Sequence, residues 1–96
     1  MKIEDLNINF NGICPKYGIL KVEVFGSFAR GDAGINSDID LIVKFDGLNN
    51  LVDRYFGFKN EVEAISNRPV EVLPDKKFKN PIFEKNVNRD RKIIYG

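Results

Sequence analysis

The stretch Ile39–Phe45 constrains the fold more than any other part of this sequence. Five of its seven residues are apolar, and they form an almost continuous run instead of a strict alternation. An almost continuously apolar strand is typical of a strand that is covered on both faces. We therefore predict a buried strand here, with other elements of the chain packed against both of its sides.

Segments of strand and helix character alternate along the rest of the chain. The segments predicted as strands are Ile19–Phe25, Pro69–Leu73 and Ile93–Tyr95, the last as an edge strand. Helices are expected over about 4–17, over about 48–66 with an interruption at Gly57, and from about Pro81 onward. This order predicts an α/β (α+β) fold, a small sheet flanked by helices, with residues 1–96 as a single domain.

Composition excludes several classes of protein. Net charge is +1 and the pI is about 7.8, whereas dedicated nucleic-acid-binding domains usually have a pI above about 9. Strong binding of duplex nucleic acid is therefore not expected. One cysteine, Cys14, permits no internal disulfide, and no apolar run is long enough to span a membrane. We expect a cytoplasmic protein without a signal peptide.

The chain contains no histidine. Any general base or metal ligand must therefore be a carboxylate or another oxygen donor. Hard oxygen ligands suit Mg²⁺, which also binds the oxygens of a triphosphate. The acidic residues are therefore the first candidates for a functional site.

A glycine-rich turn follows the first predicted strand. It runs from Gly26 to Ser37 and contains Gly26-Ser27 directly after the strand. If a short helix begins at Ser27, its free N–H groups favour an anion at the turn. Gly26 lets the backbone approach a phosphate closely, and the Ser27 hydroxyl can add a hydrogen bond. The turn is a candidate phosphate cradle.

Two aspartates lie at the start of the buried strand. Asp38 and Asp40 are two residues apart, so a strand would project both carboxylates from one face. Neighbouring carboxylates repel each other unless a cation lies between them. The alternative is that the pair is simply a solvated strand end.

Glu71 is the candidate third carboxylate. It lies within the otherwise apolar strand segment Val70–Leu73, where the presence of a charged side chain requires an explanation. It could deprotonate an acceptor hydroxyl, or it could occupy an exposed strand face without a function.

With these motifs the chain resembles the DNA polymerase beta-type nucleotidyltransferase superfamily, and within it the minimal nucleotidyltransferases (MNT). Gly26-Ser27 and Asp38-Ile39-Asp40 match the superfamily signature, while Arg30-Gly31 and Ser37 match the minimal version. The third acidic residue of the family is usually an aspartate, and here it is Glu71, one methylene longer. The resemblance covers nearly the whole chain and implies the nucleotidyltransferase fold, with its small mixed sheet.

The resemblance also implies a function and a set of site residues. Asp38, Asp40 and Glu71 would be the catalytic and metal-binding residues, with two Mg²⁺ ions expected. Gly26, Ser27, Arg30 and Ser37 would bind ATP, although Arg30 could be an ordinary surface arginine. Minimal nucleotidyltransferases commonly act as antitoxins of helical HEPN-domain toxins, and some transfer AMP from ATP to a tyrosine of the toxin. A hetero-oligomer with such a partner is therefore expected.

Two other functions stay open at this point. The chain could be a non-catalytic antitoxin that neutralises its partner by binding alone, or an enzyme that acts on a small molecule or an RNA end.

The basic residues near the C-terminus are expected to form a solvated face of the protein. They are Lys76, Lys77, Lys79, Arg89, Arg91 and Lys92. Contact of these residues with a partner protein or with RNA is the less favoured interpretation.

Overall fold

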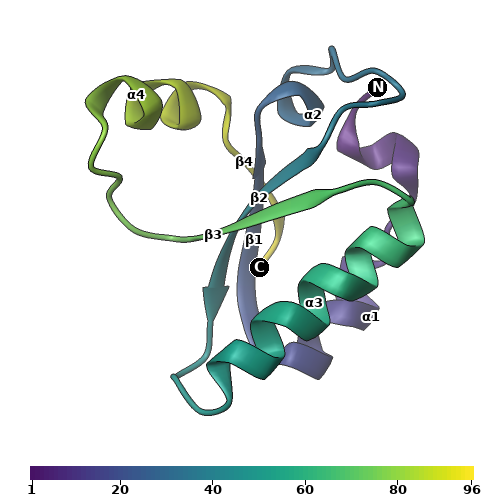
Figure 1. Ribbon diagram of the computed structural model, residues 1–96, viewed down its shortest axis with the longest axis vertical. Helices are drawn as coiled ribbons and strands as arrows, with labels where there is room; N and C mark the ends of the chain where they lie inside the picture. The colour runs from purple at the N-terminus through teal and green to yellow at the C-terminus, as the bar shows by residue number, and fades with distance from the viewer.

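The computed structural model describes residues 1–96 and consists of one four-stranded sheet with helices on its two faces (Figure 1). The strands are β1 (Ile19–Phe25), β2 (Ile39–Phe45), β3 (Val70–Pro74) and β4 (Lys92–Tyr95). The α-helices are α1 (Phe10–Ile13), α2 (Ser27–Arg30), α3 (Leu51–Ser66) and α4 (Pro81–Asp90). Two 3-10 helices, η1 (Ile3–Leu6) and η2 (Cys14–Tyr17), complete the N-terminal segment. No helix is both long and apolar enough to cross a membrane.

The strand order in the sheet is β3-β2-β1-β4. β1 pairs antiparallel with β2 and with β4, whereas β2 and β3 are parallel. The sheet is therefore mixed, as expected, and β3 and β4 are its edges. Because β1 runs opposite to β2 and β3, the end of β1 lies beside the starts of the other two strands.

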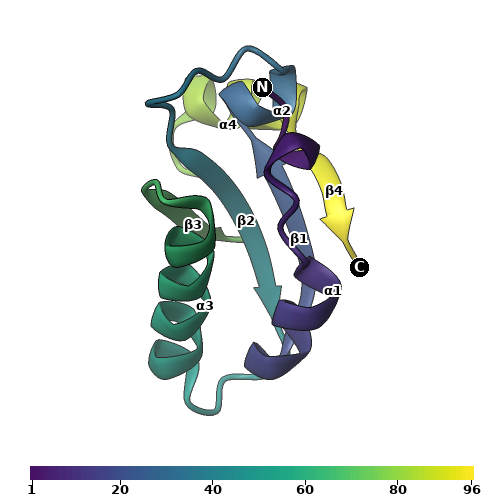
Figure 2. The ribbon, with the colours of Figure 1, turned by 90° about the vertical axis from the view of Figure 1, so that its right-hand side faces the viewer.

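The two faces of the sheet are covered unequally. α1 and α3 lie on one face, and α4 lies on the other, near one end of the strands (Figures 1 and 2). The larger core fills the first face, where Val22, Val24 and Leu41 cluster with Phe58 and Val62 of α3. These five side chains are completely buried.

A smaller core joins α4 to the second face. Phe25 and Ile42 of the sheet cluster there with Val87 of α4, and Leu73 and Phe78 pack against them. Ile42 is fully buried although its neighbours Leu41 and Val43 face the other core. The prediction that Ile39–Phe45 is covered on both faces is therefore confirmed at Leu41, Ile42 and Val43, whereas Lys44 near the end of the strand is exposed.

The single helix expected over about 4–17 is wrong. The segment is broken into η1, α1 and η2. Asn7 adopts a left-handed backbone conformation with φ 52°, and the Asn9 side chain caps α1 by accepting a hydrogen bond from the Gly12 N–H. Asparagine side chains compete with the helix ladder in this way. The segment ends at Gly18, which adopts a left-handed conformation with φ 63°.

The interruption expected at Gly57 is also wrong, because α3 continues through it. A Cβ atom at Gly57 would lie 2.6 Å from Cε1 of Tyr17. Glycine therefore lets the helix approach the Tyr17 ring. α3 begins at Leu51, three residues later than expected.

Candidate active site

The predicted carboxylates meet where the end of β1 lies beside the starts of β2 and β3. Asp40 on β2 has Phe25 as its partner on β1 and Glu71 as its partner on β3. Paired residues of adjacent strands project to the same face, so the Asp40 and Glu71 side chains are neighbours. Asp38 lies one residue before β2 and is exposed. This position agrees with the predicted strand bounds, Ile39–Phe45.

Glu71 is exposed on the face of β3 that points away from the larger core. Val70 and Val72 on either side of it are buried and belong to that core. This alternation accounts for a charge within an apolar strand without any function. The register with Asp40 is the feature that makes Glu71 a candidate, and the sequence alone does not supply it.

The pKa of Asp40 indicates that no nearby cation fully compensates the negative charge of this site. Partial burial, with added repulsion from Glu71 and Asp38, raises the pKa of Asp40 to about 6, against an ordinary value of 3.8. The positive charge of Arg30 opposes the rise without cancelling it. Such crowding of carboxylates costs free energy at neutral pH unless a cation is bound.

Gly26 adjoins the Asp40 carboxylate directly. Its φ of 72° and ψ of −151° place it in a region that residues with a side chain rarely adopt. A Cβ atom built on Gly26 would overlap Oδ2 of Asp40. A glycine is therefore required at this position because the backbone turns directly beside the Asp40 carboxylate. The sequence had suggested a different reason for the glycine, namely close approach of the backbone to a bound phosphate.

Ser27 begins α2, the predicted short helix. The carbonyl of Gly26 accepts hydrogen bonds from the N–H groups of Ala29 and Arg30, at 3.0 and 3.1 Å. The remaining N–H groups of the first turn are those of Ser27 and Phe28. These two N–H groups are the free donors at the turn, and Ser27 directly follows Gly26, the residue that adjoins the Asp40 carboxylate.

Arg30 is tied to a residue that the sequence did not single out. Its Nη1 donates to Oδ2 of Asp90 at 2.8 Å, and its Nε donates to Oδ2 of Asp32 at 3.1 Å. Asp90 ends α4 and is one of two buried charged residues in the protein. The ion pair joins α4 to the helix that carries Ser27. Only the presence of an acid between Arg89 and Arg91 hinted at Asp90 in the sequence.

Ser37 shapes the loop that leads into β2. Its Oγ accepts a hydrogen bond from the Gly34 N–H at 2.8 Å, and its carbonyl accepts one from Arg68 Nη1 at 3.0 Å. Contact between Ser37 and a nucleotide stays a prediction. The contacts present stabilise the connection that delivers Asp38 and Asp40.

A second network holds the C-terminal segment against the sheet. Arg91 donates to both carboxylate oxygens of buried Glu23, at 2.7 and 2.9 Å, and to Asp75 at 3.0 Å. Lys21 pairs with the same two carboxylates. These contacts lower the pKa of Glu23, chiefly through the hydrogen bond from Arg91. The expectation that Arg91 belongs to a solvated face is therefore wrong.

The donor set fits a hard cation that brings part of its own coordination shell. The side chains do not form a preassembled group of three metal ligands. Asp40 and Glu71 are nevertheless adjacent, with Asp38 two residues from Asp40, and all three offer oxygen donors. Mg²⁺ keeps water and phosphate oxygens among its ligands and does not need a closed protein cage.

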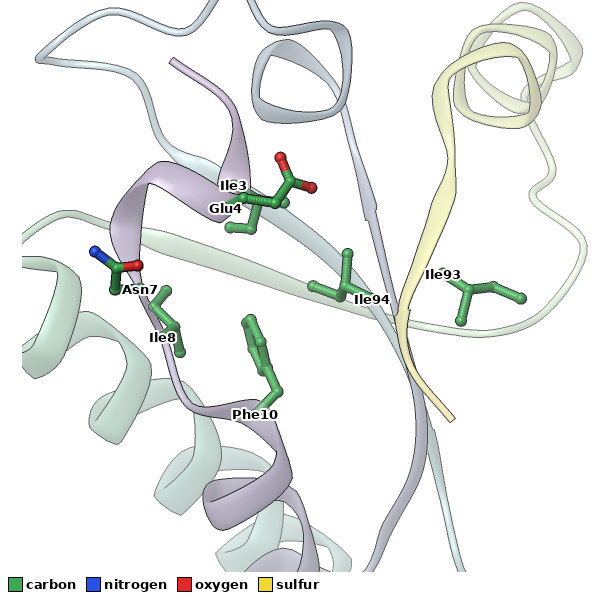
Figure 3. Close-up of a pocket in the computed structure, with 7 residues that line it drawn as sticks. All are labelled: Ile3, Glu4, Asn7, Ile8, Phe10, Ile93 and Ile94. Atoms are coloured by element: carbon green, nitrogen blue, oxygen red, sulfur yellow. The ribbon is translucent and has the colours of Figure 1, made fainter.

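A separate cavity of about 370 Å³ lies between the N-terminal segment and β4 (Figure 3). Ile3, Ile8, Phe10 and Ile94 give it an apolar lining, and Glu4 is the single carboxylate. Ile93 lies on the opposite side of β4 in the same view. This cavity has no pair of carboxylates and is not part of the candidate site.

The family model for the nucleotidyltransferase domain matches residues 9–95. The chain belongs to this nucleotidyltransferase family. The match includes every candidate site residue, so the enzyme class expected from the motifs is confirmed, although the match tests no individual residue.

Two relatives of known sequence are similar to this chain over most of its length. The chain is 33% identical over 81 residues to the "Putative protein adenylyltransferase MJ1379" of Methanocaldococcus jannaschii, an alignment that covers 83% of this chain and 79% of that protein. It is 26% identical over 80 residues to the "Protein adenylyltransferase MntA" of Thermococcus cleftensis, with 83% and 77% covered. Both relatives align with this chain over most of their own length.

Solved structures share the same fold. One described as a "putative minimal nucleotidyltransferase" superposes with a TM-score of 0.71 and 28% identity, over 96% of this chain and 95% of that one. A toxin-antitoxin crystallised with AMP-PNP superposes with a TM-score of 0.67 and 20% identity, over 93% and 74%. The second likeness establishes the fold alone. The minimal nucleotidyltransferase fold predicted from the sequence is confirmed.

Proposed function

We propose that this nucleotidyltransferase uses Mg²⁺ to transfer AMP from ATP to a tyrosine hydroxyl of a helical HEPN-domain toxin, and so acts as its antitoxin. The register that pairs Asp40 with Glu71 beside Gly26 is the observation that carries the proposal. It supplies a crowded acidic site at a turn where the backbone can approach a phosphate. The relatives described as protein adenylyltransferases support AMP transfer to a protein, and the toxin-antitoxin of the same fold supports the partner.

Each residue has a role in this reaction. The acceptor oxygen attacks the α-phosphorus of ATP, the bond to the β-phosphate oxygen breaks, and pyrophosphate leaves. Glu71 would accept the proton from the acceptor hydroxyl, while the Gly26–Ser27 turn would hold the triphosphate. Asp38, Asp40 and Glu71 are the residues that would bind Mg²⁺, with two ions expected. The metal would neutralise charge on the phosphate oxygens.

Ser27 and Arg30 would contribute in different ways. Ser27 can donate one hydrogen bond to a charged phosphate oxygen, which is worth about 1.5–3 kcal/mol. Arg30 is already bound to Asp32 and Asp90, so its main effect would be to fix α2 and to add positive charge near the phosphates. Ser37 would complete the nucleotide-binding turn.

Substitutions of Glu71 test the proposal. Glu71→Gln should lower the transfer rate at saturating ATP by roughly 10²–10⁴, the usual contribution of a general base. ATP affinity should change little, because the turn and the aspartates hold the nucleotide. Glu71→Asp is the matched control and should remain active. Similar rates for the parent and Glu71→Gln would remove Glu71 from the reaction, and an inactive parent would favour an antitoxin that acts by binding alone.

A further inference from the structure

Positive charge is concentrated in the last quarter of the chain. Residues 75–92 contain seven Lys or Arg and three Asp or Glu, although the whole chain carries a net charge of only +1. Residues 1–74 consequently have an excess of acidic groups. Such asymmetry in a nearly neutral protein indicates a surface that meets an anionic partner.

Many of the basic residues of this protein are already paired, while the lysines near α4 are not. The arginines make hydrogen bonds with carboxylates or backbone carbonyls, and Lys16, Lys21 and Lys59 form ion pairs. The lysines of the β3–α4 loop and of α4 are outside these pairs. They are Lys76, Lys77, Lys79 and Lys85, and all but Lys85 lie within one four-residue stretch.

The acidic residues nearby are already occupied. Asp75 pairs with Lys21 and Arg91, and Glu84 accepts a hydrogen bond from the Phe78 N–H at 2.8 Å. Glu84 is therefore the one nearby carboxylate that is not paired with a cation, and the four lysines keep an excess of positive charge. Unneutralised like charges on one surface repel each other and favour an anionic ligand.

Three of these lysines, Lys77, Lys79 and Lys85, line an open groove of about 430 Å³ around Phe78. Asn88 and one carboxylate, Glu84, complete its polar lining, so the cations outnumber the anions three to one. A groove of this size accommodates a short peptide segment. The ammonium groups are strongly hydrated point charges, which suit carboxylates.

The groove flanks the candidate active site. Ile42 and Leu73 pack in the same small core as Val87 of α4 and Phe78. Each lies two residues after a site carboxylate on the same strand face, Ile42 after Asp40 and Leu73 after Glu71. Two residues of a strand span about 6.6 Å. α4 and its preceding loop therefore border the face of the sheet from which an acceptor must approach.

We propose that the groove formed by the β3–α4 loop and α4 binds an acidic segment of the protein whose hydroxyl receives the nucleotide. This inference rests on the proposed function and specifies the chemistry of the partner. An acidic segment seated here would bring the residues next to it over Glu71. A nucleic acid is disfavoured because the groove is short and its cations are lysines without exposed aromatic partners in a series.

The test measures binding without nucleotide. The probe is a fluorescein-labelled peptide with one tyrosine flanked by glutamates, followed by fluorescence anisotropy at low salt. We expect Lys77→Glu with Lys85→Glu to weaken binding at least 10-fold, and added salt to weaken binding to the parent protein. The matched control, Lys44→Glu with Lys92→Glu, makes the same change in net charge outside the groove and should bind as the parent does.

Three results would overturn the inference. The first is equal binding of the glutamate peptide and a peptide with serines in place of the glutamates. The second is equal loss of binding in the two double variants. The third is tighter binding of a single-stranded RNA of equal charge. A protein with Asp38→Asn and Asp40→Asn should keep peptide binding and lose transfer, so this inference and the proposed function fail independently.

Discussion

Removal of the Asp40 charge should stabilise the metal-free protein. The pKa of Asp40 is raised to about 6 from 3.8, so the folded state holds its proton more tightly than the unfolded state does. Stability is therefore lost as pH rises through the window from about 4 to about 6, and the whole penalty is present at pH 8. A shift of about 2 pH units corresponds to about 3 kcal/mol.

Because Asp40 is only partly buried, solvent screening reduces this figure to about 1–2 kcal/mol. For a domain of this size, the gain corresponds to a rise in Tm of roughly 5–10 °C. The assay is thermal unfolding of the parent and Asp40→Asn, followed by circular dichroism in EDTA at pH 8 and at pH 4. We expect the variant to be more stable at pH 8 and the difference to vanish at pH 4.

Asp75→Asn provides a control of opposite sign. The hydrogen bond from Lys21, with a further one from Arg91, lowers the pKa of Asp75, so this variant should be less stable than the parent at pH 8. Mg²⁺ with ATP should stabilise the parent more than Asp40→Asn and so narrow the gap between them. If Asp40→Asn were no more stable than the parent at pH 8, the description of Asp40 as an uncompensated charge would be wrong.

Two further substitutions test the surroundings of this carboxylate. Gly26→Ala should destabilise the fold by about 1–3 kcal/mol, because its positive φ with an extended ψ is a conformation that is essentially restricted to glycine. The added methyl group should also abolish transfer through overlap with Asp40, as measured by unfolding and by nucleotide transfer; an active variant would rule out this turn. Asp90→Asn should raise the KM for ATP several-fold with little change in kcat, because Arg30 loses its buried partner. Asp90→Glu should restore most of the affinity for ATP. An unchanged KM in Asp90→Asn would show that Asp90 stabilises the fold and does not affect nucleotide binding.

Much of the sheet could be predicted from the sequence. β1 and β2 have the predicted bounds. β1 is rich in apolar residues and lies between Gly18 and Gly26, and β2 is an almost continuous apolar run between Asp38 and Asp46. The periodicity of apolar side chains and the positions of turn residues are local properties of the sequence. They also predicted α2, β3 and the edge strand β4. The N-terminal segment was not predictable in the same way, because the capping by Asn9 and the left-handed Asn7 override a weak helical period.

Contacts between distant parts of the chain could not be predicted. Glu23 and Arg91 are 68 residues apart, and Arg30 and Asp90 are 60 residues apart. Nothing in the local pattern distinguishes these charges from solvated ones. The same limit applies to the site, where the sequence supplied the carboxylates but the pairing of β2 with β3 was needed to place Glu71 beside its partner.

The most direct test of nucleotidyl transfer is the origin of the transferred phosphate. The purified protein is incubated with a HEPN-domain toxin, Mg²⁺ and ATP that carries ³²P at either the α- or the γ-position, and the toxin is analysed for label. We predict label from α-³²P ATP alone, and its loss when Asp38→Asn and Asp40→Asn are combined. Label from γ-³²P ATP, or undiminished α-label in the double variant, would contradict the proposed site and reaction.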